Sequence, residues 1–146
     1  MRIYLDADKA IEGLAKKLAS LETGAKAAVM DMLIEGSDVM IDGLQRGVAE
    51  YGHAPPGKSG RATGGLAESI QRKGSPKATE DGGEVIITFA GTDEHGERYG
   101  EIAAVLNYGS SSIPADHWID NTVEMVKPLA EQAMAQALDR HLKGAE

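Results

Sequence analysis

The sequence predicts an α+β domain with helices in its N-terminal part, a small antiparallel sheet in the middle and a long C-terminal helix. Apolar residues recur with helical spacing over much of residues 8–51 and again over residues 116–142. Between them, residues 69–73 and 84–90 have the composition and turn-rich flanks of strands. With 146 residues, of which 42% are hydrophobic, the chain is most simply one domain, residues 1–146, with a real core.

The N-terminal region is predicted to hold a short strand over residues 2–5 and then a helix that begins near Asp8. The apolar positions of this helix follow the i, i+3, i+4, i+7 pattern; they are Ile11, Leu14, Ala15 and Leu18. Thr23 and Gly24 end the helix, because neither continues its apolar stripe.

Residues 24–51 predict a longer helix, of about 40 Å at 1.5 Å per residue. Gly36, Gly43 and Gly47 lie on or beside its apolar stripe. Each glycine costs up to about 1 kcal/mol relative to alanine in a helix interior. Two explanations remain open at this point: a kink or break near Gly36, or the close approach of a second backbone.

Residues 52–65 are predicted to form a flexible surface loop, because they contain five Gly and two Pro and have no apolar periodicity. Thr63 is expected to cap a single helical turn that ends at Leu66. The strands 69–73 and 84–90 follow, joined by residues 74–83 as an exposed hairpin. Their buried face is assigned to Ile70, Val85, Ile87 and Phe89.

The last part of the chain contains a turn over residues 91–96, a short helix and the long C-terminal helix. Ile102, Val105 and Leu106 predict the short helix. It ends at Gly109, where glycine can adopt a positive φ angle, and Pro114 prevents its continuation.

Asp116 is expected to cap the final helix, which extends to about Leu142. Pro128 is expected to kink this helix or divide it in two. Trp118, the only Trp, opens the helix. Trp118 has two interpretations: a plug in the core, or an anchor in an interface with another protein.

The composition argues against several functions. A net charge of −8 is unfavourable for a protein that grips nucleic acid through its phosphates. The chain has no Cys, which excludes disulfides and thiolate chemistry. No segment has the length of a signal peptide's apolar core or of a membrane span. We therefore expect a protein that is made and kept in a cytoplasm, with no membrane partner.

Candidate catalytic and metal sites are weak. His53, His95, His117 and His141 share no metal-ligand spacing. The acidic turn at residues 93–97 could attract a cation, but it lacks the ligand alternation of a calcium loop. Residues 110–112 are three Ser in a turn, without a nucleophile-elbow motif. The sequence predicts no enzyme, no cofactor and no bound metal.

Two segments resemble a family of small bacteriophage proteins, the head–tail joining or tail-component proteins of long-tailed phages. The first is Thr63-Gly-Gly-Leu-Ala-Glu-Ser-Ile70. The second begins with Tyr99-Gly-Glu-Ile, reaches Tyr108-Gly109 and continues through Pro114 to Trp118. Members of this family carry similar segments in the same order, and the resemblance covers roughly residues 24–143.

The resemblance implies a structural subunit of a phage or prophage neck or tail, found in the virion and, during assembly, in the cytoplasm of the bacterial host. It implies a homo-oligomeric ring, commonly a hexamer, that joins a head-side connector or stopper to tail tube or terminator proteins and lets DNA pass as cargo. The candidate assembly residues come from the loop and from the second segment; they are Lys58, Arg61, Thr63, Gly64, Tyr108, Gly109, His117 and Trp118.

Two other functions remain open. One is a tail terminator or tube-like subunit. The other, from a different class, is a small nucleotide-binding enzyme, because Gly52, Gly57, Lys58 and Ser59 match the phosphate-loop pattern G-x-x-x-x-G-K-[ST]. That motif requires a preceding strand and a following helix, whereas here a helical pattern precedes it and a glycine-rich segment follows.

We predict that the phosphate-loop match does not bind nucleotide, because Pro55 and Pro56 remove two of the N–H groups that such a loop would use. Calorimetry with ATP or GTP and magnesium should show no heat of binding. A micromolar dissociation constant that is abolished by Lys58→Ala would favour the enzyme over the structural subunit.

Overall fold

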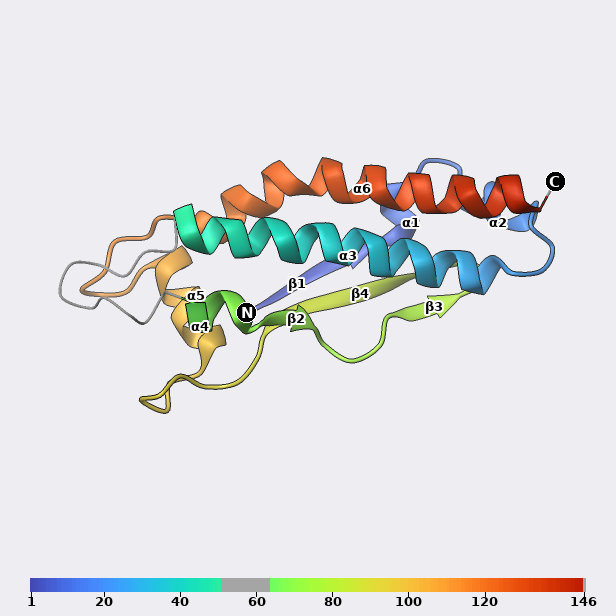
Figure 1. The fold of residues 1–146 in the computed structure, drawn as a ribbon. Coiled ribbons are helices and arrows are strands. Elements are labelled where there is room, and N and C mark those ends of the chain that lie inside the picture. The colour runs from blue at the N-terminus through green and yellow to red at the C-terminus, as the bar shows by residue number, and fades with distance from the viewer. Residues whose placement is uncertain (51–63, 146) are drawn as a thin grey trace. The chain divides into compact units, whose positions relative to one another are not determined.

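The computed structural model describes residues 1–50 and 64–145, and the α+β class is confirmed (Figure 1). The elements follow in the order β1 (Arg2–Asp6), α1 (Ala7–Ala10), α2 (Leu14–Ala19), α3 (Ala25–Glu50), α4 (Gly64–Glu68), β2 (Ile70–Arg72), β3 (Lys77–Thr79), β4 (Gly82–Phe89), α5 (Tyr99–Tyr108) and α6 (Trp118–Gly144). The predicted N-terminal helices, central sheet and long C-terminal helix are therefore all present.

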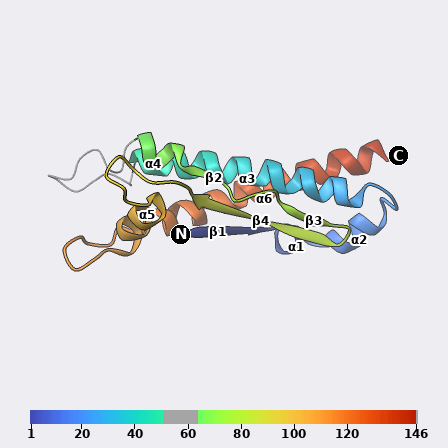
Figure 2. The same cartoon turned by 90° about the horizontal axis from the view of Figure 1, so that it is seen from below.

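The sheet is antiparallel with the order β1-β4-β2, and β3 also pairs with β4. Figure 2 shows β3 beside the start of β4. The prediction of a plain hairpin over residues 74–83 is wrong, because β3 lies within it and pairs Lys77 with Glu84 and Thr79 with Gly82. Pairing through the backbone needs no apolar pattern, so the polar composition of this segment concealed the strand.

A local network holds the tight turn between β3 and β4. The Thr79 hydroxyl donates to the carbonyl of Gly82 at 2.8 Å. Gly82 has a φ angle of 148°, which only glycine adopts without strain. The N–H of Gly83 donates to the Asp8 carboxylate at 3.1 Å, so α1 also fixes the turn.

The chain divides into two compact units by its internal contacts. Unit 1 comprises Met1–Ile3, Ile41–Gln71 and Ile87–Val126, and unit 2 comprises Tyr4–Met40, Arg72–Ile86 and Lys127–Glu146. The helices α3 and α6 contribute residues to both units. That residues 1–146 act as a single domain stays a prediction.

Unit 2 has an aliphatic core. Its buried members come from β1, the helices and their connections, and β4; they are Leu5, Ala7, Ile11, Leu14, Leu18, Leu21, Ala25, Ala28, Val29, Met32, Leu33, Val85, Ala130, Met134, Ala137 and Leu138. The single helix predicted from Asp8 is wrong, because Ile11 is extended and Gly13 has a φ angle of 73°. These two residues separate α1 from α2, and Ala15 is exposed.

The helix α3 runs without a break from Ala25 to Glu50, so of the two explanations left open for its glycines a break near Gly36 is excluded. The three glycines instead allow close approach, by side chains of α6. A Cβ atom at Gly36 would lie 2.7 Å from Met134 Cγ, one at Gly43 2.5 Å from Val126 Cγ2, and one at Gly47 2.7 Å from the Thr122 hydroxyl oxygen. Real Cβ atoms do not approach other atoms so closely, and each glycine therefore provides space for one α6 side chain.

The helix α6 continues past Pro128, so the predicted division into two helices is wrong. Pro128 leaves the carbonyl of Glu124 without its intrahelical donor. Both residues are exposed, so water can supply the missing hydrogen bond. An exposed position thus accommodates the proline within a helix held by its buried face.

We predict that Gly43→Ala destabilises the protein by about 1–3 kcal/mol, because the new methyl group would overlap a stiff β-branched side chain. Higher helix propensity offsets at most about 1 kcal/mol of this. Urea unfolding followed by Trp118 fluorescence measures the change. Gly100→Ala, in a helix of the same unit and where a Cβ would come no closer than 3.4 Å to another residue, is the matched control and should be near neutral. Unchanged stability in Gly43→Ala would contradict the close-packing explanation.

Candidate assembly surface

The two sequence segments that carry the family resemblance meet in unit 1. Tyr99 begins α5, and its phenol oxygen lies where a side chain at Gly65 in α4 would extend. The carbonyl of Ser69 accepts a hydrogen bond from the N–H of Ala90 at 2.8 Å. The first segment therefore packs beside the start of the second, although the strands β3 and β4 separate them in sequence.

The aromatic residues of unit 1 join the second segment to the sheet. Trp118 is fully buried, and its ring meets that of Phe89 edge-on, with centroids 6.1 Å apart and an interplanar angle of 76°. The core interpretation of Trp118 is thus the correct one, and its ring offers no surface to a partner. Leu66, Ile87, Ile102 and Leu106 are buried in the same unit.

Residues 109–117, which we call the connector, join α5 to α6 through backbone hydrogen bonds. Gly109 ends α5 with a φ angle of 81°, as predicted, and its N–H donates to Val105 at 2.7 Å. The N–H groups of Asp116 and His117 donate to the carbonyls of Leu106 and Asn107, at 3.3 and 2.9 Å. The connector therefore leaves α5 and returns to its last turn.

Within the connector, Ser110 makes the hydrogen bonds that hold a turn over residues 110–113. Its N–H donates to the carbonyl of Ile113 at 2.8 Å, and its hydroxyl oxygen accepts the N–H groups of Ser112 and Ile113 at 3.3 and 3.2 Å. The three successive Ser thus build a turn, which is the structural role that such residues commonly have.

Asn107 and Asp116 satisfy the first N–H groups of α6. The Asp116 carboxylate accepts from Trp118 at 2.9 Å, which confirms the predicted cap. The side-chain oxygen of Asn107 accepts from Ile119 and Asp120, at 2.9 and 3.2 Å. These donors have no partner inside the helix, so the two side chains fix the position at which α6 begins.

Asn107 is a residue that the sequence analysis missed. It is fully buried, and its amide nitrogen also donates to the Asp120 carboxylate at 3.1 Å. One signal was available: a polar Asn stands on the apolar side of a short helix, directly before Tyr108 and Gly109. A buried amide needs partners for both its oxygen and its nitrogen, and here the start of α6 supplies them.

The connector surface consists of the exposed residues of this region, namely Tyr108, Ser110, Ser111, Ser112, Pro114, Ala115, Asp116 and His117. Tyr108 is 58% exposed. His117 has a positive φ angle of 54°, and its Nδ1 lies 3.2 Å from the Asp120 carboxylate. Residues 99–126 contain no Lys or Arg, so the charged groups of this segment other than His117 are acidic.

The structure brings only some of the predicted assembly residues together. Tyr108, Gly109 and His117 lie on or beside the connector surface, whereas Trp118 lies beneath it in the core. Lys58, Arg61 and Thr63 fall outside the residues that the structure describes, as do most of the predicted 52–65 loop and the phosphate-loop match.

The predicted helical turn that ends at Leu66 is present as α4, which extends to Glu68; because Gly64 opens it, the predicted loop is two residues too long at its C-terminal end. Two glycines are poor helix formers, but tertiary contacts hold this turn. Leu66 is buried. The N–H of Ser69 donates to Gly65 at 3.0 Å, and the side chain of Gln45 donates to the carbonyl of Ala67 at 3.3 Å.

The other candidate sites are structural turns or are not assembled. Asp93 accepts the N–H groups of His95 and Glu97, at 2.8 and 2.9 Å, so its carboxylate organises the acidic turn. Among the described residues no three His, Asp or Glu side chains are grouped so that they could hold a metal ion. Within the same part of the chain, no helix combines the length and apolar character needed to cross a membrane.

Comparisons with known proteins give no relative for this chain. No family model, no curated protein and no solved structure matches it. The interpretation of the connector surface therefore rests on its own residues and geometry.

We predict that Asn107→Ala lowers the free energy of unfolding by about 2 kcal/mol or more, because it leaves two helix N–H groups and the Asp120 carboxylate without their buried partner. Fluorescence of Trp118 during urea unfolding measures this loss. Asn121→Ala is the matched control: Asn121 is exposed in the first turns of α6, and its removal should change stability by less than about 0.5 kcal/mol. Equal effects of the two substitutions would exclude the capping role.

Proposed function

We propose that this protein is a structural subunit of a phage or prophage neck or tail, which forms a ring around the DNA channel and joins the head connector to the tail. The connector surface is the observation that carries the proposal. It is built by the segment Tyr99–Trp118, on which the family resemblance depends, and it displays Tyr108 on a connection fixed by Asn107, Ser110 and Asp116.

The construction of the connector suits an assembly contact. A loop whose backbone is already hydrogen-bonded loses little conformational freedom when it docks. An exposed tyrosine contributes a large apolar area with a polar end, which makes it a common anchor in protein interfaces. These properties favour recognition of a protein surface over a chemical step, and none of the side chains on this surface is arranged as a nucleophile with a base.

The charge of unit 1 suits a ring through which DNA moves as cargo. In its described residues the only Lys or Arg residues are Arg2, Arg46 and Arg98. Arg46 pairs with Asp42 at 3.0 Å, and Arg98 pairs with Glu101. Tight binding of DNA phosphates requires clustered Lys or Arg side chains that are not paired with carboxylates. The described residues of this unit lack such a cluster, so they would let a duplex pass rather than hold it.

The proposed partners are further copies of the chain, a head-side connector or stopper, and tail tube or terminator proteins. Assembly would take place in the cytoplasm of the bacterial host, and the protein would remain at the virion neck or tail. A tail terminator or tube-like subunit has the same general chemistry, and the particle phenotype described next separates it from a joining protein.

We predict that a phage or prophage whose gene for this protein is inactivated produces DNA-filled heads and normal tails that are not joined. Electron microscopy of the lysate measures joining, and the wild-type gene supplied from a plasmid should restore tailed, infectious particles. Tails of abnormal length would favour the terminator alternative. Joined, infectious particles without the protein would exclude the proposed function.

A further inference from the structure

Among the residues that the structure describes, two that are not glycine have a positive φ angle: His117 and Glu22, both at 54°. This left-handed region is strained for residues with a Cβ atom, although Asn, Asp and His enter it more readily than the others. Glycine adopts it without strain. Both side chains are exposed, so neither is needed to fill the core. Each position therefore holds a side chain where glycine would fit the backbone better.

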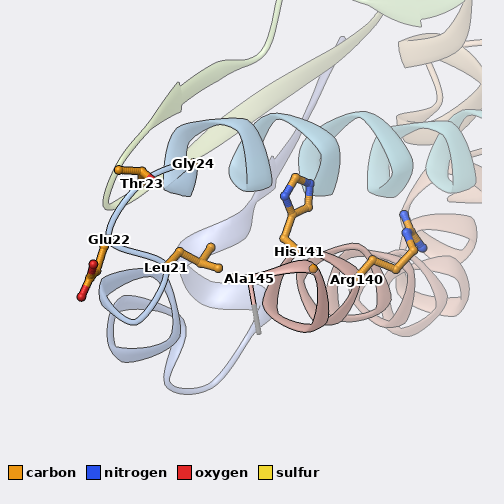
Figure 3. A pocket seen from close by; sticks show the side chains of 8 residues that line it. Leu21, Glu22, Thr23, Gly24, Arg140, His141 and Ala145 are labelled. Carbon is orange, nitrogen blue, oxygen red and sulfur yellow. The ribbon is translucent and has the colours of Figure 1, made fainter.

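Glu22 provides the reference for His117. It lies in the connection between α2 and α3, which together with the last turns of α6 lines a hollow of about 610 Å³ beside Leu21 (Figure 3). The exposed Glu22 side chain points away from Arg140 and His141 of α6. Glu22 thus has the same φ angle as His117 but lies in the other unit of the chain.

The backbone of His117 is held in its conformation by α5 and α6. Its N–H donates to the carbonyl of Asn107 at 2.9 Å, and its carbonyl accepts the N–H of Asn121 at 2.9 Å. These hydrogen bonds use main-chain atoms, so a glycine at position 117 could make them as well. The imidazole is therefore not required for the course of the connector.

The imidazole ring is nevertheless held in one orientation. Nδ1 of His117 lies 3.2 Å from Asp120 Oδ2, which also accepts the amide of the buried Asn107 at 3.1 Å. An ionised carboxylate can only accept, so Nδ1 is the ring nitrogen that carries the hydrogen, and in the neutral ring Nε2 is an acceptor. The His117 side chain is 56% exposed, and among residues 1–50 and 64–145 no group is hydrogen-bonded to Nε2.

The contact with Asp120 does not by itself account for a side chain in a strained position. It joins two exposed groups, and such surface pairs contribute little to stability. Strained residues persist where the surrounding structure fixes them, and they are concentrated at functional sites. An exposed ring with one fixed nitrogen and one available nitrogen is therefore a candidate contact for a partner.

The charges near His117 indicate the chemistry of that partner. Asp116, Asp120 and Glu124 are exposed in a segment, residues 99–126, that contains no Lys or Arg. A group that approaches Nε2 meets this negative charge, which favours a positively charged donor. We infer that His117 is a contact residue of the connector surface, and that its Nε2 accepts a hydrogen bond from a Lys or Arg side chain of a partner protein. This inference rests on the proposed function, because it names the chemistry by which the assembly surface would be recognised.

Complementation tests the contact in a phage or prophage whose gene for this protein is inactivated. The full-length protein is supplied from a plasmid as wild type, His117→Gly or Glu22→Gly, at equal protein levels. His117→Gly should lower the yield of joined, infectious particles about tenfold or more, as expected for the loss of an anchor contact. Glu22→Gly, which changes a residue with the same φ angle, should leave the yield unchanged. Equal yields from the two variants would overturn the inference.

Urea unfolding of the purified variants, followed by far-ultraviolet circular dichroism, separates this loss from a folding defect. Neither glycine variant should unfold at a lower urea concentration than wild type, because each removes backbone strain and no buried side chain. If His117→Gly does unfold earlier, His117→Asn takes its place in the particle assay with the same expected loss. Asparagine tolerates the left-handed conformation but lacks the imidazole.

His117→Gln and His117→Lys test the chemistry of the partner group. Glutamine keeps an acceptor at the end of its side chain and should retain more joining than His117→Gly. Lysine presents a positive charge to a positive partner and should join no better than His117→Gly. A higher yield from lysine than from glutamine would identify an acidic group on the partner and overturn the inference. The joining function itself fails only if the phage without any plasmid is infectious, so the two failures are distinguishable.

Discussion

The packing of α6 against α3 is the constraint on which the rest of the structure depends. Gly36, Gly43 and Gly47 are spaced by seven and four residues, so they lie on one face of α3. Each one leaves room for an α6 side chain where any other residue would overlap it. The gain in close packing offsets the loss of helix propensity, which reaches about 1 kcal/mol per glycine. In unit 2, Leu5 of β1 and Val85 of β4 join the buried cluster to which both helices contribute.

The second constraint is the start of α6. Three N–H groups at the beginning of this helix find acceptors in Asn107 and Asp116. Since Asn107 belongs to α5, the register of α6 and the course of the connector are set by the same buried amide. The same amide also sets the position of Tyr108, which follows it directly. The surface proposed for assembly therefore depends on Asn107, a buried residue that a partner could not contact.

The sequence predicted the class and most element positions because these follow from apolar periodicity. Val85, Ile87 and Phe89 alternate as a half-buried strand must, and all three are buried. The failures have physical causes. The strand β3 has only Ala78 packed against the core and otherwise shows a polar sequence. The loop was extended over Gly64 and Gly65 because glycines are poor helix formers, and Pro128 is tolerated because its missing hydrogen bond faces water.

The candidate site was predicted less completely. Gly109 and Asp116 were identifiable because each has a local conformational role, a positive φ angle and a helix cap. Asn107 was not, since its partners lie on another helix and no spacing rule connects them. The hollow beside Leu21 is equally invisible in the sequence, because residues from the α2–α3 connection and from the end of α6 form it together.

The position of Trp118 has a spectroscopic consequence. It is the only Trp, and it lies with Phe89 in unit 1, whereas the buried cluster of unit 2 contains no aromatic residue. Trp118 fluorescence, excited selectively over that of the tyrosines, therefore reports on unit 1 alone, while far-ultraviolet circular dichroism reports on the helices of both units. Whether these two signals change together during denaturation measures directly the cooperativity between the units. Trp118 is thus a natural fluorescent probe of unit 1.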